Sequence, residues 1–231
     1  MGITLECDEP RLGNGPNNLA YLAAALLATY APKRGVHISL KKRVPWQAGL
    51  GGGSSDAAAV LRGLNQLWQL HWPFAKLAEL AAELGSDVPF FLSGGLALAT
   101  GRGETITALE SCPRSRVALV VPPFGLSTPA VYRAFRLQAV ESPGWSELLS
   151  ALRAGEYQQI RKLLHNDLEQ PAFQLRPDLA EVKQQLTNAG YPVLLSGSGS
   201  SLFVLLPDLG GEQLAALIPR GYRLIHTCFQ F

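Results

Sequence analysis

The residues with the clearest chemical potential form one glycine-rich run, Gly49-Leu50-Gly51-Gly52-Gly53-Ser54-Ser55. It lies between a segment of alternating apolar and polar residues, 35–43, and a segment with helical apolar spacing that we expect to begin at Ser54 or Ser55. Glycines let backbone N–H groups approach an anion, and the unpaired N–H groups at a helix start attract negative charge. Strand, run and helix together predict a phosphate-binding loop. A flexible Gly/Ser linker is the alternative, but a linker is not expected directly between a strand and a helix.

Two familiar phosphate loops are excluded by the sequence. The Walker loop needs a Gly-Lys pair before Ser or Thr, and the chain contains no Gly-Lys pair. The dinucleotide loop needs Gly-x-Gly-x-x-Gly, which the chain also lacks. The run therefore indicates another class of nucleotide-binding protein.

Asp87 is the second candidate for chemistry. It follows Gly85, which we expect to end an amphipathic helix over residues 74–84, and it precedes Val88-Pro89. A carboxylate fixed in this way can orient a hydroxyl and accept its proton during phosphoryl transfer. Taken alone, an aspartate at such a place is more typical of a turn or a helix cap than of a catalytic base.

Two polar segments in the second half of the chain are weaker candidates. Ser196-Gly197-Ser198-Gly199-Ser200-Ser201 lies between two apolar, strand-like segments, and by itself it is more typical of a tight turn than of a binding loop. Ser127-Thr128-Pro129 precedes a predicted helix near 131–137, where Thr128 would suit a helix cap.

These motifs together resemble the GHMP kinases. Pro45 followed by Gly49 to Ala59 is similar to the ATP loop of that family, and Leu84-Gly85-Ser86-Asp87-Val88-Pro89-Phe90-Phe91 narrows the match. It resembles members that phosphorylate a hydroxyl of a cytidine-diphosphate conjugate in the non-mevalonate isoprenoid pathway. Asn17-Asn18-Leu19, Lys41 to Pro45, Gly101 to Glu104 and Leu195 to Ser200 match in the same order. His165-Asn166-Asp167-Leu168 resembles an Asn-Asp-Leu segment of the family that we interpret as structural.

The resemblance assigns an expected role to each candidate residue. Asp87 would be the catalytic base toward the attacking hydroxyl. Residues binding ATP would be Pro45, Gly49, Leu50, Gly51, Gly52, Gly53, Ser54, Ser55, Asn18 and Lys42, although a helix cap for Asn18 and a surface lysine for Lys42 remain open. Thr128, Gly197, Ser198 and Gly199 would lie on the substrate side. Mg²⁺ would accompany the ATP phosphates, with Ser55 as the hydroxyl near the metal.

The resemblance also concerns the start of the chain. The resembled kinases carry an N-terminal segment with a catalytic Lys, a phosphate-contacting Asn and a cytosine-recognising His, and residues 1–16 do not match it. Either the true start lies upstream or the protein is a shortened relative. The first is favoured, because losing edge strands would expose sheet hydrogen bonds while the other motifs are intact. If residues 1–231 are the whole product, weak or no kinase activity is expected.

Composition limits the remaining classes. The chain has 231 residues, 47% hydrophobic and 16% charged, which predicts a folded protein with a sizeable core. A net charge of +2 with scattered basic residues does not favour nucleic-acid binding, and no apolar stretch is long enough for a membrane span. Three separated cysteines indicate reduced thiols and a cytoplasmic protein rather than a disulfide or zinc framework. Its partner would be a small molecule, and it would be a monomer or a homodimer.

The predicted fold is α+β in two domains, residues 1–112 and 113–231. The resemblance implies the GHMP-kinase fold, with a first domain like the second domain of ribosomal protein S5, lacking its first strands, and a ferredoxin-like second domain. Two other functions stay open at this stage. One is another GHMP small-molecule kinase, such as homoserine kinase, and the other is a catalytically inactive nucleotide-binding protein.

Overall fold

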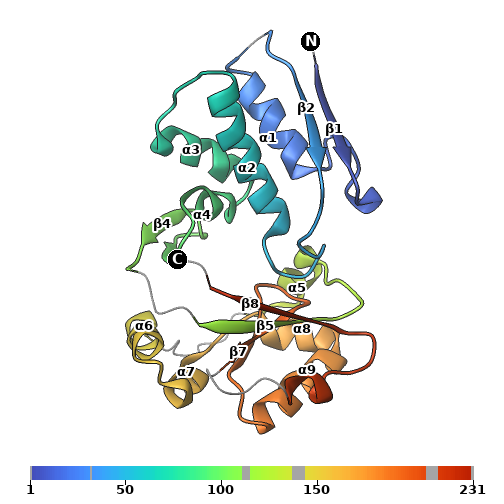
Figure 1. The fold of residues 1–231 in the computed structure, drawn as a ribbon, viewed down its shortest axis with the longest axis vertical. Helices are drawn as coiled ribbons and strands as arrows, with labels where there is room; N and C mark the ends of the chain where they lie inside the picture. The colour runs from blue at the N-terminus through green and yellow to red at the C-terminus, as the bar shows by residue number, and fades with distance from the viewer. Residues whose placement is uncertain (1, 32, 111–114, 137–143, 207–212, 230–231) are drawn as a thin grey trace. The chain divides into compact units, whose positions relative to one another are not determined.

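The computed structural model describes residues 2–31, 33–110, 115–136, 144–206 and 213–229 (Figure 1). Contacts divide the chain into two units. Unit 1 contains Met1–Val44 and Gly51–Glu110, and unit 2 contains Pro45–Leu50 and Ser111–Phe231. The chain therefore enters unit 2 just before the glycine-rich run and returns to unit 1 within it. The domain boundary expected at residues 112 and 113 lies outside the described residues.

Unit 1 begins with two parallel strands, β1 (Ile3–Cys7) and β2 (Val36–Leu40), in which Leu5 lies opposite Ile38. The connection between them contains a helix, as a parallel pair requires. The other elements of unit 1 are the 3-10 helix Pro10–Leu12, α1 (Leu19–Ala28), α2 (Gly52–Leu67), α3 (Phe74–Leu84), α4 (Val88–Ser93), β3 (Ala97–Thr100) and β4 (Thr105–Ala108). The last two strands form an antiparallel pair.

Small side chains allow α1 and α2 to pack closely (Figure 1). Ala23 and Ala24 of α1 and Ala57 and Ala58 of α2 are all buried in one apolar cluster, to which α3 and α4 add leucine and valine side chains. Ala59, which completes the alanine run, is exposed. The packing fixes the start of α2, and with it the second half of the glycine-rich run.

Unit 2 is built on a four-stranded antiparallel sheet in the order β6-β7-β5-β8. Its strands are β5 (Arg116–Val121), β6 (Val193–Leu195), β7 (Leu202–Leu206) and β8 (Arg223–Cys228). Counted within the unit, the order is second, third, first, fourth, which is the ferredoxin-like arrangement that the resemblance implied. The helices are α5 (Thr128–Ala134), α6 (Trp145–Ala154), α7 (Tyr157–Leu163), α8 (Glu169–Leu175), α9 (Pro177–Asn188) and the 3-10 helix Leu214–Leu217.

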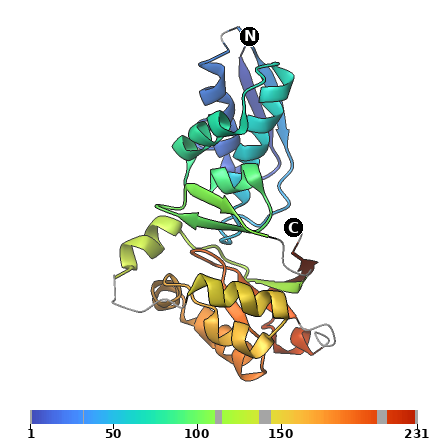
Figure 2. The same ribbon diagram turned by 90° about the vertical axis from the view of Figure 1, so that its left-hand side faces the viewer.

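Helices cover both faces of this sheet. Ala118 and Val120 of β5 are buried in a cluster with residues of α5, α8 and α9, whereas Val117 and Leu119 contact the cluster of α6 and α7. This alternation follows from the two-residue period of a strand. In Figure 1, α6 and α7 lie on one side of the sheet and α8 and α9 on the other, and Figure 2 shows α6 and α7 in front of it.

The structure corrects three sequence expectations. The helix expected from Ser54 or Ser55 begins at Gly52, inside the glycine run. The short helices α4 and α8 were not expected, because each contains an early proline, Pro89 or Pro171. A first helical turn tolerates proline, so both helices form.

In the part of the chain that the structure describes, no helix is long and apolar enough to cross a bilayer.

Candidate functional site

The start of α2 has the backbone geometry of an anion cradle. Gly51 precedes the helix in a left-handed conformation, with φ of 64°, and supplies no side-chain cap. The N–H of Ser55 donates to the carbonyl of Gly51 (2.9 Å). The N–H groups of Gly52, Gly53 and Ser54 come before it and have no carbonyl within the helix to bind. Because the helix begins earlier than expected, the N–H groups of two glycines belong to this positive end.

The ring of Phe91 explains why a glycine stands at position 51. A Cβ added to Gly51 would lie 2.4 Å from Cζ of Phe91, so only a bare backbone fits against the ring. Phe91 belongs to α4, the helix that begins just after Asp87. The start of α2 and the candidate base Asp87 are therefore linked inside unit 1 by packing of α4 against the loop before α2. Phe91 lies in the sequence motif around Asp87, but local spacing gives no sign of this contact.

A lysine–aspartate pair lies beside the cradle. The ammonium of Lys42 pairs with the carboxylate of Asp56, and the two side chains are only 8% and 19% exposed. A Cβ on Gly52 would be 3.3 Å from Nζ of Lys42, which places the positive charge at the helix start. This position suits the nucleotide contact expected of Lys42. Asp56 was missed, although an acidic residue near a helix start after a basic strand end is a usable signal.

Ser55 and Asn18 have defined local roles. The hydroxyl of Ser55 donates to the carbonyl of Gly52 (2.8 Å), which leaves its oxygen lone pairs free to accept. Asn18 is 4% exposed and caps α1: its Oδ1 accepts from the N–H of Ala20 and its Nδ2 donates to the carbonyl of Gly13. The helix-cap alternative is thus what the structure shows for Asn18, and its nucleotide contact stays a prediction.

Asp87, the expected catalytic base, lies at the start of α4, and its role stays a prediction. It occupies the cap position of α4 but accepts no capping hydrogen bond, and it is exposed. Among the residues described by the structure, none forms an ion pair with its carboxylate. The buried neighbours Val88 and Pro89 fix the backbone on its C-terminal side. The carboxylate is therefore exposed at the start of a short helix whose next two residues are buried.

In unit 2 the first part of the glycine run contacts the second glycine-rich loop. The hydroxyl of Ser196 donates to the carbonyl of Gly49 (2.8 Å), and the N–H of Ser201 donates to the carbonyl of Ala48 (3.1 Å). The φ of Gly49 is 71°, and a Cβ there would lie 1.9 Å from the carbonyl oxygen of Ser196. Two loops that are 147 positions apart in the sequence, counted from Gly49 to Ser196, are therefore in close backbone contact.

The substrate-side candidates also meet in unit 2. The hydroxyls of Thr128 and Ser198 are 2.8 Å apart, and Ser198 is only 7% exposed. Gly197 and Gly199 flank Ser198 with φ of 53° and 86°, conformations that favour glycine. Thr128 is the first residue of α5, not its cap: Ser127 occupies the cap position. The helix starts earlier than 131 because Pro129 fits its first turn.

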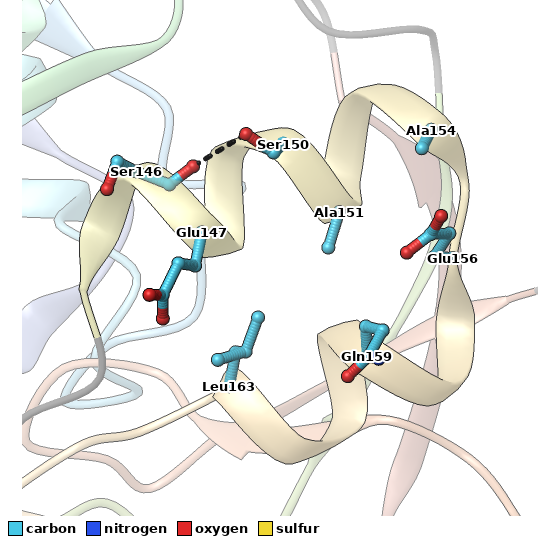
Figure 3. Close-up of a pocket in the computed structure, with 8 residues that line it drawn as sticks. All are labelled: Ser146, Glu147, Ser150, Ala151, Ala154, Glu156, Gln159 and Leu163. Atoms are coloured by element: carbon cyan, nitrogen blue, oxygen red, sulfur yellow. Dashed lines mark hydrogen bonds between the residues drawn. The ribbon is translucent and has the colours of Figure 1, made fainter.

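A hollow in unit 2 holds none of these candidates. It measures about 570 Å³ and lies between α6 and α7 (Figure 3). Its lining residues are Ser146, Glu147, Ser150, Ala151, Ala154, Glu156, Gln159 and Leu163. The hollow is open, and its wall mixes carboxylates, hydroxyls and small apolar groups. It is not the site that the motifs predict.

Comparison with known proteins places the chain in a family. Models of the GHMP kinase N-terminal and C-terminal domains match residues 18–95 and 148–221. The 4-diphosphocytidyl-2-C-methyl-D-erythritol kinase of Shouchella clausii is 46% identical over 204 residues, which cover 87% of this chain and 69% of that protein. The chain belongs to the GHMP kinases. The enzyme of the same name from Geobacillus kaustophilus is 48% identical over 191 residues, 82% of this chain and 66% of that protein.

A solved structure supports the membership of this GHMP kinase. The crystal structure of a 4-(cytidine 5'-diphospho)-2C-methyl-D-erythritol kinase superposes with a TM-score of 0.79 at 39% identity, covering 99% of this chain and 82% of that one. The two-domain GHMP-kinase fold is thereby confirmed. Members of the family are ATP-dependent small-molecule kinases, so ATP is the phosphate donor. The chain spans about two thirds of the length of the curated relatives named above.

Proposed function

We propose that this kinase transfers the γ-phosphoryl group of ATP to the 2-hydroxyl of 4-diphosphocytidyl-2-C-methyl-D-erythritol, in the non-mevalonate route to isoprenoid precursors. The observation that carries the proposal is the joint placement of cradle and base in unit 1. The glycine start of α2 packs through Phe91 on α4, which begins after Asp87. The acceptor is inferred from the relatives of that name, at 46% and 48% identity.

The phosphates of ATP would lie at the start of α2. The N–H groups of Gly52, Gly53 and Ser54 are the donors that the helix leaves unpaired. The ammonium of Lys42 adds a positive charge at the same end, where its pairing with Asp56 holds it. Pro45, Gly49, Leu50 and Gly51 would complete the loop around the nucleotide, with Asn18 near its base or ribose.

Asp87 would act on the acceptor hydroxyl. In phosphoryl transfer the protein mainly positions the reactants and stabilises developing charge, and a carboxylate at the nucleophile orients the oxygen and accepts its proton. The exposed, uncapped carboxylate of Asp87 is able to do both. Thr128, Gly197, Ser198 and Gly199 would contact the substrate, a role supported by the contact between the Thr128 and Ser198 hydroxyls at the second loop.

Mg²⁺ fits the donor set at the start of α2. Magnesium prefers oxygen ligands and is usually held by few protein groups together with substrate phosphates. Ser55 would hold it, because its oxygen keeps lone pairs after donating to Gly52. When bound, the ion would neutralise charge on the transferring phosphates.

The cellular setting is part of the same proposal. We infer a cytoplasmic enzyme, a monomer or a homodimer, that acts on a small molecule and does not bind nucleic acid or membranes. The division into an ATP-binding domain, residues 1–112, and a second domain, residues 113–231, is also retained as a proposal.

A panel of acceptors tests the function. The purified protein would be supplied with ATP, Mg²⁺ and either the diphosphocytidyl substrate, homoserine or mevalonate, while ATP binding is measured separately by calorimetry. Phosphorylation of the diphosphocytidyl substrate alone is expected. Transfer to homoserine or mevalonate instead would overturn the choice of acceptor. ATP binding without transfer to any acceptor would favour an inactive nucleotide-binding protein. Absence of ATP binding would refute the proposal that the start of α2 binds the ATP phosphates.

A further inference from the structure

Asn166, between α7 and α8, uses its whole side-chain amide on backbone groups. Its Oδ1 accepts from the N–H of Leu168 (2.9 Å). Its Nδ2 donates to two carbonyls of the second glycine-rich segment, Leu195 (2.9 Å) and Gly197 (2.8 Å). One side chain thus ties the turn before α8 to both ends of the tripeptide Leu195-Ser196-Gly197, which leads into Ser198.

The chemistry of these three bonds requires a carboxamide. Two donors and one acceptor are needed at the end of a short side chain, which among the amino acids only asparagine offers at this length. An aspartate would keep the bond from Leu168 but would turn an oxygen toward two carbonyl oxygens. An alanine would remove all three bonds and leave both carbonyls without this donor.

The first residue of α8 holds the same segment at another atom. Oε1 of Glu169 accepts from the N–H of Leu195 (2.9 Å), while its carboxylate also pairs with Lys183. The N–H and the carbonyl of Leu195 are therefore bound by Glu169 and Asn166, at the start of α8 and in the turn before it. The loop that follows makes the contacts described above, from Ser198 to Thr128 and from Ser196 to Gly49.

We infer that Asn166 is a positioning residue, which sets the conformation of residues 196–199 and so aims Ser198 and Thr128 at the acceptor. This rests on the proposed function, and it goes beyond the structural role that the Asn-Asp-Leu resemblance suggested. The tie to the ATP loop is made by the hydroxyl of Ser196 and not by Asn166. Loss of Asn166 should therefore affect the acceptor more than ATP.

Three variants separate positioning from stability. Asn166→Ala removes all three hydrogen bonds. Asn166→Asp keeps the side-chain volume but replaces the N–H₂ donor by an oxygen that can only accept. Asn65→Ala is the matched control: Asn65 is also half-buried and bonds both the N–H and the carbonyl of Trp72, in the connection between α2 and α3. All three should lower the melting temperature, but Asn65 touches neither glycine-rich loop.

Kinetics with the diphosphocytidyl acceptor provide the first readout. We expect kcat/KM for the acceptor to fall roughly 10- to 100-fold in Asn166→Ala, as misplacement of positioning groups by about 1 Å does. The fall should be larger in Asn166→Asp, because a carboxylate faces two carbonyls. ATP affinity, measured by calorimetry, should fall less than kcat/KM in the Asn166 variants, and the kinetics of Asn65→Ala should stay at parental values. If only the side-chain volume of Asn166 mattered, kcat/KM would fall more in Asn166→Ala than in Asn166→Asp.

Amide hydrogen exchange provides a readout that does not need turnover. The N–H groups of Ser196, Gly199 and Ser201 are bonded within or against the loop, so they report on its conformation. Faster exchange over residues 195–201 in both Asn166 variants, but not in Asn65→Ala, supports the inference. Unchanged exchange overturns it, and so does faster exchange with unchanged acceptor kinetics. If the parent transfers no phosphate, the proposed function fails, and exchange alone decides whether Asn166 holds the loop.

Discussion

Replacing Gly49 by alanine tests whether the two glycine-rich loops depend on close backbone contact. The added Cβ would lie 1.9 Å from the carbonyl oxygen of Ser196 and 2.9 Å from the N and O atoms of Gly199. Real Cβ atoms essentially never come within 3.0 Å of such atoms, so the loops would separate by at least 1.1 Å, the difference between 3.0 and 1.9 Å. The φ of 71° adds strain that glycine does not have.

The expected loss of stability follows from these contacts. A left-handed conformation costs an alanine about 1–2 kcal/mol. The separation breaks the bonds from Ser196 Oγ to the carbonyl of Gly49 (2.8 Å) and from the N–H of Ser201 to that of Ala48 (3.1 Å). Each such bond contributes about 0.5–1.5 kcal/mol, so the free energy of unfolding should fall by about 2–5 kcal/mol in total. ATP affinity should fall too, because Gly49 begins the phosphate loop.

Urea unfolding and ATP calorimetry would measure both effects, with Gly63→Ala as the control. Gly63 is exposed inside α2, and a Cβ there meets nothing within 4 Å. Alanine at an ordinary helical position is more favourable than glycine by about 1 kcal/mol, so this control should be slightly more stable and bind ATP as the parent does. If Gly49→Ala unfolds at the parental urea concentration and binds ATP with parental affinity, the loop contact is not what we describe.

Two further predictions concern groups outside the backbone loops. Lys42→Met should lower stability, since it leaves the carboxylate of Asp56 unpaired, and it should lower ATP affinity, since it removes the positive charge. Adding Asp56→Asn to the Lys42→Met chain should restore stability but not ATP affinity. Recovery of both would refute a role of Lys42 in ATP binding. Burial, and secondarily Asp178, raises the pKa of the Tyr222 phenol above its ordinary value of 10. The folded state therefore keeps this proton longer than the unfolded state, and stability is lost as pH rises above 10. Tyr222→Phe should lose less stability over that range, and an unchanged pH profile of the melting temperature would contradict the assignment.

Local patterns in the sequence were enough to predict most elements of the fold. The two-residue alternation near 36–40 and the apolar strands of unit 2 were recognisable, as was the helix after the glycine run, because these features depend on near neighbours. The exact start of α2 was not, since glycines in a helical first turn carry no helical preference of their own. The short helices α4 and α8 were missed because six or seven residues with a proline give too little periodicity.

The residue types of the candidate site were predicted better than its contacts. Gly49 and Asp87 stand out from local spacing and the family resemblance. The bond between Ser196 and Gly49, and the packing of Phe91 on Gly51, depend on how segments distant in the sequence come together. Asn166 shows the same limit. The Asn-Asp-Leu resemblance indicated a structural role, but only its three hydrogen bonds show that it contacts Leu168, Leu195 and Gly197.

The central claim is that Asp87 serves a phosphate cradle as the base of a phosphoryl transfer. Its most direct test is to measure turnover of the diphosphocytidyl acceptor and ATP affinity in Asp87→Asn beside the parent. The side chain is exposed and uncapped, so the substitution should not disturb the fold. We predict a fall in kcat of about 10²–10⁴, the usual contribution of a general base, with ATP affinity unchanged. Parental turnover in Asp87→Asn would contradict the account.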